Sequence, residues 1–319
     1  MEPITSLADI QNLECDAHFH LVEPKQGAHQ PDENNLTRID EKPDTPAELI
    51  VLENKWPVVG IIIPFSILGT LIRIGLQSLE TYNGAPVFGL VYAQWIGCFI
   101  MGVVVWNKIK LLQWYLPLHT GLSTGLCGSI TTFSSWQLNI FEEFSNYNGA
   151  DHVTGYNILA AISQLLVTIA MSICGLQFGY HVGEFLTKKS EKRVEMVACG
   201  FSLQQLGFRD YLVMAFGVLS WIAVVIAAIF APQRRELALS CVFSPLGALL
   251  RWYLSPLNIY GGGRYPWGTF SANISGTAIL AGLTAAGSSG KLRLIDCNVI
   301  NALATGLCGC LTTISTFVR

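Results

Sequence analysis

The sequence predicts an all-α integral membrane protein that contains two antiparallel four-helix units, joined by one further transmembrane helix. Three observations lead to this prediction: 51% of the residues are hydrophobic and only 13% are charged, long uncharged segments follow one another, and the chain contains an internal repeat. Soluble domains average about 25% charged residues. The composition therefore excludes an ordinary soluble globular protein.

Residues 1–54 differ in composition from the rest of the 319-residue chain. They contain 12 acidic and 3 basic residues, whereas residues 55–319 contain 10 acidic and 16 basic residues. Five prolines interrupt the first segment, and no helical or strand periodicity is sustained in it. We therefore expect an acidic, disordered tail. Because no basic helix face with interleaved aromatic residues occurs in the sequence, we expect no nucleic-acid partner.

Eight segments after the tail are long enough to span a bilayer, which requires about 20 mostly apolar residues per helix. Only the first and the sixth contain a charged residue, Arg73 and Arg251 respectively. The predicted spans are residues 56–79, 87–106, 111–141, 153–183, 211–233, 237–257, 265–290 and 297–318. Spans one to four are expected to form a first unit, 55–186. A basic cytoplasmic loop, 187–210, then leads to the linker helix, 211–233.

Three short motifs recur in the same order at nearly the same spacing. The pairs are Gly69-Thr-Leu-Ile-Arg73 with Gly247-Ala-Leu-Leu-Arg251, Ala93-Gln94-x-x-Gly97 with Ala272-Asn273-x-x-Gly276, and Thr124-Gly-Leu-Cys-Gly128 with Thr305-Gly-Leu-Cys-Gly309. Their offsets are 178, 179 and 181 residues. This agreement indicates a duplicated unit, so the last three spans begin a second copy, residues 237–319.

The second copy is incomplete by this comparison. At an offset of 181 residues its fourth helix is expected near position 334, whereas the sequence ends at Arg319. We therefore expect a truncated second unit with three spans, in a chain that is a fragment or a shortened form.

The linker span has no counterpart in either copy. Four spans and one linker make an odd number, so the second copy enters the membrane from the opposite side and the two copies are antiparallel. Nine basic residues lie in the loops on the side of the tail and four on the other side, which favours a cytoplasmic N-terminus. They are Lys55, Lys108, Lys110, Lys188, Lys189, Lys192, Arg193, Arg209 and Arg264 on the first side, and Arg234, Arg235, Lys291 and Arg293 on the second.

Spans three and eight contain an unusual pattern of glycines followed by two threonines. It occurs over residues 125–132 and again over residues 306–313, and it is unfavourable for a continuous helix. One interpretation is a helix break near mid-membrane, where the freed backbone carbonyls require protein, water or an ion as partner. The alternative is a continuous helix whose small residues allow close packing. The sequence leaves both interpretations open.

The polar groups within the predicted spans are mainly hydrogen-bond donors. No span has an Asp or Glu near its centre, which disfavours proton-coupled exporters that use an intramembrane carboxylate. Donors without an acid favour an anion or a neutral solute. Phe133, Trp136 and Phe317 flank the expected breaks at i, i+3 spacing. Such aromatic residues either pack in a core or face lipid, or they direct their positive ring edges at an anion.

With these motifs the chain resembles the fluoride exporter family, the fluoride channels of the Fluc (CrcB) type, and most closely their fused eukaryotic form. The resemblance rests on G-x-L-x-R in spans one and six and on Gly268-Thr-Phe-Ser-Ala-Asn273-x-x-Gly276. It rests also on Gly-x-x-Thr-Thr-Phe-Ser-x-aromatic over residues 128–136, which recurs with Ile in place of Phe over residues 309–317. It covers residues 56–319 and leaves the tail outside.

The resemblance implies a passive, fluoride-selective channel rather than an enzyme. The implied protein exports fluoride from the cytoplasm, has a plasma-membrane location, and works as a monomer that forms a pseudo-dimer in the lipid bilayer. The family also implies a structural sodium ion, Na+, held by the backbone carbonyls of Gly128, Thr131, Gly309 and Thr312. The implied fluoride pore consists of Asn273, Thr269, Phe133, Phe317, Ser135 and Thr316, with Arg73 and Arg251 near the vestibules.

This sequence departs from the family's pattern at four positions. Gln94 replaces an Asn, Leu90 stands at the position of Thr269, and both Trp136 and Ile314 replace a Phe. We therefore expect one working pore and one degenerate pore, the latter with Gln94, Trp136 and Ile314. Two alternatives remain, an inverted-repeat transporter of another small anion or neutral solute, and a membrane scaffold that transports nothing.

Overall fold

The structure, a computed structural model, describes residues 55–82, 87–147, 149, 153–188, 206–259, 265–288 and 294–318. Every regular element within these ranges is helical, which confirms the predicted all-α class. The acidic tail, 1–54, and most of the basic loop, 187–210, lie outside the described residues.

The first unit begins with α2 (Lys55–Glu80) and ends with the long helix α8 (Thr154–Lys188). Between them lie α3 (Val91–Trp106), α4 (Lys108–Trp114), α5 (Leu116–Thr120), the π-helix η2 (Gly121–Cys127), α6 (Gly128–Ile130) and α7 (Ser134–Ser145). Helix α3 packs along α8, where Gly102 lies against the backbone of Leu176 and Gly179. A side chain at Gly102 would separate the two helices, because small residues permit such close approach within a membrane.

The linker helix α9 (Phe208–Phe230) packs against α2. The contact is made at Gly60 and Gly217, each of which lies against the backbone of the other helix. Most other side chains of α9 are exposed and apolar, among them Leu219 and Phe230. Such a surface is expected of a helix whose solvent is lipid.

The second unit repeats the order of the first. Its elements are η3 (Pro232–Arg234), α10 (Arg235–Leu254), η4 (Ser255–Ile259), α11 (Trp267–Gly287), α12 (Leu294–Ala302), the π-helix η5 (Leu303–Cys308) and α13 (Gly309–Leu311). Helix α10 corresponds to α2, and α11 corresponds to α3. The segment α12, η5 and α13 corresponds to α5, η2 and α6.

Four helices in the described part of the chain are long and apolar enough to cross a membrane, Lys55–Glu80, Gly155–Thr187, Phe208–Phe230 and Pro232–Ile259. A fifth is obtained if Val91–Trp106 and Lys108–Trp114, which meet at a bend of 71°, count as one span. The eight predicted spans are therefore not eight continuous apolar helices. Helix α11 is continuous but carries several Ser and Thr residues and an Asn, and the third and eighth spans are broken.

Both predicted breaks are present, which excludes the continuous-helix alternative. The backbone becomes extended at Thr131, with φ −88° and ψ 147°, and at the equivalent Thr312, with φ −95° and ψ 152°. In the first unit a new helix, α7, starts three residues after Thr131. The glycine and threonine motif therefore ends a helix within each unit.

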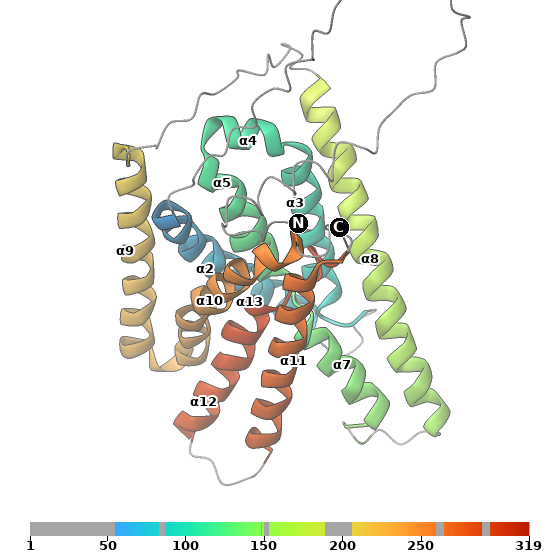
Figure 1. The fold of residues 1–319 in the computed structure, drawn as a ribbon. Coiled ribbons are helices and arrows are strands. Elements are labelled where there is room, and N and C mark those ends of the chain that lie inside the picture. The colour runs from blue at the N-terminus through green and yellow to red at the C-terminus, as the bar shows by residue number, and fades with distance from the viewer. Residues whose placement is uncertain are drawn as a thin grey trace, which may run out of the picture.

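Figure 1 shows α9 and α8 at opposite edges of the molecule, with α2 and α10 between them. Helix α4, which lies between α3 and α5 in the chain, is at the top of this view, whereas the last turn of α11 and the first turn of α12 are at the bottom. Helix α9 runs from top to bottom, and α10 begins where α9 ends (Figure 1). The two copies thus turn back at opposite ends of the molecule.

Candidate functional site

The two helix breaks meet at the centre of the fold through a network of buried hydroxyl groups. Thr131 Oγ1 lies 2.9 Å from Thr313 Oγ1, and Thr132 Oγ1 lies 3.1 Å from Thr312 Oγ1. The members of the network have no exposed surface and are Thr131, Thr132, Ser134, Thr312, Thr313 and Ser315. Hydroxyls both donate and accept, so the network satisfies itself without a charged group.

The contacts of this network are reciprocal between the two copies. The backbone N–H of Ser134 donates to Thr312 Oγ1 at 3.0 Å, and that of Ser315 donates to Thr131 Oγ1 at 3.4 Å. The offset of 181 residues between the copies converts the first of these contacts into the second. It likewise converts the Thr131–Thr313 pair into the Thr312–Thr132 pair. A reciprocal exchange of this kind is the signature of a two-fold interface. The sequence repeat is therefore also a repeat in space.

The amides of Gln94 and Asn273 hold the extended backbone at the two breaks. Gln94 Nε2 donates to the carbonyl of Thr132 at 2.6 Å, and Gln94 Oε1 accepts from the N–H of Thr132 at 3.2 Å. Asn273 Nδ2 donates to the carbonyl of Thr313 at 3.0 Å, and its Oδ1 accepts from the N–H of Thr313 at 2.8 Å. These bonds replace helical bonds lost at the break. The two predicted pore amides thus have the same structural role, and each retains one further N–H.

Arg73 and Arg251 are buried at the centre, with 1% and 5% of their surface exposed. Arg251 Nη1 donates to the carbonyls of Gly128 at 2.8 Å and Thr312 at 3.1 Å, and its Nη2 donates to the carbonyl of Thr124 at 2.6 Å. Arg251 therefore reaches from its own copy to the segment that precedes the break of the other copy.

The contacts of Arg73 are fewer than those of Arg251. Arg73 Nη2 donates to the carbonyl of Thr305, while its buried Nη1 has no hydrogen-bond partner among the residues that the structure describes. Gly309 lies directly against this guanidinium, as Gly128 lies against that of Arg251. A Cβ atom at either glycine would displace the opposing arginine, which explains glycine at both positions.

Two of the four carbonyls expected to hold sodium are bonded to a guanidinium in this arrangement and do not fit that ion. The carbonyls of Gly128 and Thr312 both accept hydrogen bonds from Arg251 Nη1. A sodium ion on the same oxygens would lie within a few ångströms of a guanidinium, and like charges at that distance repel strongly in a buried site.

The aromatic residues of the two breaks lie together. The ring centroids of Phe133 and Phe317 are 5.6 Å apart, and those of Phe133 and Trp136 are 5.4 Å apart with an edge-to-face geometry. Phe317 is 48% exposed, whereas Trp136 and Ile314 are buried at 2% and 0%. Trp136 and Ile314 belong to one apolar cluster, which also includes Leu90. The residues of the predicted degenerate pore are therefore packed as core.

The remaining predicted pore residues lie close to these groups. Ser135 Oγ accepts from Thr132 Oγ1 at 3.4 Å. Thr269 is buried, and Asn258 bonds both its N–H, at 2.9 Å, and its hydroxyl, at 3.3 Å. Thr316 is half-buried next to Phe317 in the chain. None of these contacts requires the hydroxyls to face an ion.

A polar stripe on α8 was missed in the sequence analysis. Gln164, Thr168 and Ser172 recur at four-residue spacing and are buried on the long helix that packs against α3 and α7. Gln164 Oε1 and Thr168 Oγ1 have no hydrogen-bond partner among the described residues, and the hydroxyl of Ser172 lies near the thiol of Cys98. The carbonyl of Gln164 accepts from Trp136 Nε1 at 3.2 Å. The i, i+4 spacing of these polar residues was the signal that could have found them.

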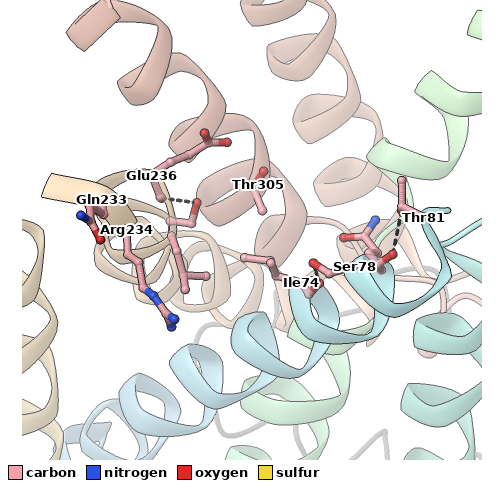
Figure 2. A pocket seen from close by; sticks show the side chains of 10 residues that line it. Ile74, Ser78, Thr81, Gln233, Arg234, Glu236 and Thr305 are labelled. Carbon is pink, nitrogen blue, oxygen red and sulfur yellow. Dashed lines mark hydrogen bonds between the residues drawn. The ribbon is translucent and has the colours of Figure 1, made fainter. Parts of the chain in front are cut away.

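A cavity of about 700 Å³ lies between the end of α2 and the start of α10. Figure 2 shows Ile74, Ser78 and Thr81 on one wall, Arg234 and Glu236 on another, and Thr305 between them. Thr305 is the residue whose carbonyl accepts from Arg73, so the cavity ends near that guanidinium. It was missed because its walls come from segments that are distant in the sequence.

The comparisons with known proteins identify two related segments. The CrcB-like protein family (Camphor Resistance, CrcB) matches residues 60–180 and 238–319. The Fluoride export protein 1 of Candida albicans is 33% identical over 298 residues, which cover 82% of this chain and 72% of that protein. The Fluoride export protein 1 of Neurospora crassa is 29% identical over 323 residues, which cover 82% of this chain and 60% of that protein.

A smaller bacterial relative matches less of the chain. The Fluoride-specific ion channel FluC 1 of Staphylococcus aureus (strain bovine RF122) is 31% identical over 113 residues, which cover 35% of this chain and 88% of that protein. No solved structure matches the chain.

The two matched segments coincide with the two copies and leave out α9. One bacterial channel corresponds in length to about one copy. The names of the relatives describe export proteins and an ion channel, in agreement with the expectation that the chain is not an enzyme. The two segments and the long alignment to fungal relatives show that the chain belongs to the CrcB-like protein family.

Proposed function

We propose that the protein is a passive channel that exports fluoride from the cytoplasm. The observation that carries this proposal is the burial of Arg73 and Arg251 in a centre that has, among the buried residues the structure describes, no Asp or Glu. A buried charge without an opposite charge is costly. An anion that passes close to the centre supplies that opposite charge, and the names of the relatives indicate fluoride.

The orientation of the two copies is part of this proposal. The odd number of predicted spans favours antiparallel copies. So do the opposite positions in Figure 1 of α4 and of the end of α11 with the start of α12. With a cytoplasmic N-terminus, the end of α2 and the α9–α10 connection lie on the outer side. The cavity between α2 and α10 then serves as the outer vestibule, with Arg73 close to its inner end.

The working pore is formed by Phe133, Phe317, Asn273 and Thr269, with the hydroxyls of Ser135 and Thr316. The contact of Phe133 with Phe317 across the two copies supports this assignment. The packing of Trp136, Ile314 and Leu90 into one apolar cluster supports a degenerate second pore. The polar α8 stripe favours instead a pathway along Trp136, because the backbone carbonyl of Gln164, one member of the stripe, accepts from Trp136 Nε1.

Flow through such a pore needs no energy source beyond the membrane potential. A potential that is negative inside drives anions outwards, by about 2.3 kcal/mol per charge for each 100 mV. Weak donors in series suit a small anion, because each replaces part of the hydration shell without trapping the ion. The proposed protein acts as a monomer, since both copies are in one chain, and resides in the plasma membrane.

Reconstitution into lipid vesicles tests the proposed function. Vesicles loaded with potassium fluoride are treated with a potassium ionophore, and a fluoride electrode records efflux. We expect fluoride efflux from vesicles that contain the protein and none from protein-free vesicles. Parallel vesicles loaded with chloride or formate test the alternative anions. Efflux of chloride or formate at a comparable rate contradicts fluoride selectivity, and absence of fluoride efflux contradicts the function.

A further inference from the structure

The guanidinium of Arg251 occupies a position that joins both helix breaks. It donates to the carbonyls of Thr124 and Gly128 in the first copy and to that of Thr312 in the second, at 2.6 to 3.1 Å. Thr312 is the residue at which the second copy's backbone becomes extended, and Gly128 begins the short helix before the first copy's break. One cation therefore crosslinks the two copies through their backbone oxygens.

Carbonyl oxygens gathered around a single positive charge are the usual surroundings of a bound metal ion, and here that charge is covalently attached. Arg251 is 5% exposed, and the buried residues that the structure describes include no carboxylate to pair with it. Hydrogen bonds from a charged donor are about twice as strong as neutral ones. The three carbonyl dipoles thus stabilise the guanidinium as they would stabilise a metal cation.

The second guanidinium does not repeat this arrangement. Within the described part of the chain, Arg73 donates only to Thr305, and its Nη1, which lies against Gly309, has no hydrogen-bond partner. Two guanidiniums that shared the same central carbonyls would repel each other. The two arginines therefore do not follow the two-fold symmetry of the hydroxyl network. Arg251 is the one that bonds to carbonyls of both copies.

We propose that the Arg251 guanidinium is the resident cation of this centre and replaces a bound sodium ion. The protein then needs no sodium for stability, because the positive charge that holds the two breaks together is part of the chain. Only the transport part of this inference rests on the proposed function, since stability can be measured whether or not fluoride passes.

The stability test compares the purified protein in detergent with sodium, potassium or N-methyl-D-glucamine as the chloride salt, at equal ionic strength. A ligand at 100 times its dissociation constant raises the midpoint of thermal unfolding by roughly 5 °C for a domain of this size. We expect a sodium-dependent shift of less than about 1 °C, well below that figure. A saturable rise of several degrees in sodium alone would overturn the proposal.

Two variants sharpen the test. Arg251→Ala opens the three carbonyls, so we expect its unfolding midpoint to fall in N-methyl-D-glucamine and to recover partly in sodium. Arg73→Ala, the matched control, removes one hydrogen bond and is expected to show no recovery in sodium. Recovery of Arg73→Ala, or a sodium-independent Arg251→Ala, contradicts the assignment. If Arg251→Ala cannot be purified, the sodium titration of the unmodified protein still decides the question.

The transport test replaces sodium by N-methyl-D-glucamine on both sides of the vesicle membrane. We expect fluoride efflux by the unmodified protein to change by less than about twofold, a barrier change of roughly 0.4 kcal/mol. Loss of efflux on removal of sodium, with recovery when it is returned, would overturn the proposal. Absence of efflux in every salt would instead contradict the proposed function and leave the stability test to judge this inference.

Discussion

Arg73 and Arg251 occupy equivalent positions in the two copies, yet their surroundings differ. Arg251 donates three hydrogen bonds to backbone carbonyls of both copies, whereas Arg73 donates one and leaves Nη1 without a partner. The aromatic residues differ in the same way. Phe133 and Phe317 are in contact with partial exposure, whereas the equivalent Ile314 and Trp136 are fully packed.

Some structural features are the same in both copies, and others differ between them. The extended threonines, the amide clamps of Gln94 and Asn273, and the hydroxyl network are present in both copies. These features provide hydrogen bonds to buried backbone groups, and a buried backbone group without a hydrogen bond destabilises the fold. The contacts of the arginines and of the aromatic residues, in contrast, differ between the two copies.

The largest difference in stability is expected between Trp136 and Phe317. Trp136→Ala removes a buried ring and its hydrogen bond to Gln164, so we expect a loss of about 3–5 kcal/mol in the free energy of unfolding. Phe317→Ala removes a half-exposed ring and is expected to cost about 1 kcal/mol, mainly its contact with Phe133. Denaturant unfolding in detergent micelles measures both. A greater loss for Phe317→Ala would show that the packed and open sides are wrongly assigned.

A smaller difference is expected between the glycines that face the arginines. Gly128→Ala displaces Arg251, which has three hydrogen bonds, and is expected to cost about 3 kcal/mol. Gly309→Ala displaces Arg73, which has one, and is expected to cost about 1–2 kcal/mol. The measurement is the same unfolding experiment. Equal costs would mean that Arg251 contributes no more to the centre than Arg73.

The smallest difference is expected within the hydroxyl network. Ser134 Oγ contacts Thr312 Oγ1 at 2.9 Å and the carbonyl of Cys308 at 3.3 Å, whereas Ser315 Oγ contacts Thr131 and Thr313 at 3.1 Å. We expect Ser134→Ala to cost about 1–2 kcal/mol and Ser315→Ala about 0.5–1 kcal/mol. Unfolding midpoints compared under one condition resolve the order. The reverse order would indicate that the network is more symmetric than these distances suggest.

The local sequence indicated the helix breaks but left a continuous, closely packed helix as an alternative, and the structure decides for the breaks. Glycines followed by two threonines disfavour a helix wherever they occur, and Thr131 and Thr312 are extended as expected. The repeat also predicted that the two breaks are equivalent. The number of long apolar helices was overestimated, because residues 87–106 and 265–290 were each counted as an uninterrupted apolar span. Helix α3 instead bends by 71° into α4, and α11 carries several Ser and Thr residues and an Asn.

The contacts of the arginines and the cavity could not be predicted from the sequence. Arg251 reaches Thr124 and Gly128, which lie more than 120 residues away along the chain. No local pattern encodes such a pairing, which depends on how the two copies cross. The cavity has the same origin, since α2 and α10 form its walls. The α8 stripe, in contrast, could have been predicted from the sequence, because Gln164, Thr168 and Ser172 recur at a helical spacing.

The amides of Gln94 and Asn273 provide the most direct test of the central claim, a fluoride channel with one working pore. Both make the same two bonds to the backbone of a break, so their alanine variants are expected to lose similar stability. Fluoride efflux per reconstituted protein should separate them. If only one pore works, Asn273→Ala lowers efflux by about 100-fold or more, a barrier increase of roughly 2.7 kcal/mol, while Gln94→Ala retains most of it. Loss of efflux in Gln94→Ala with survival in Asn273→Ala would contradict this assignment and place the pathway beside Trp136 and the α8 stripe.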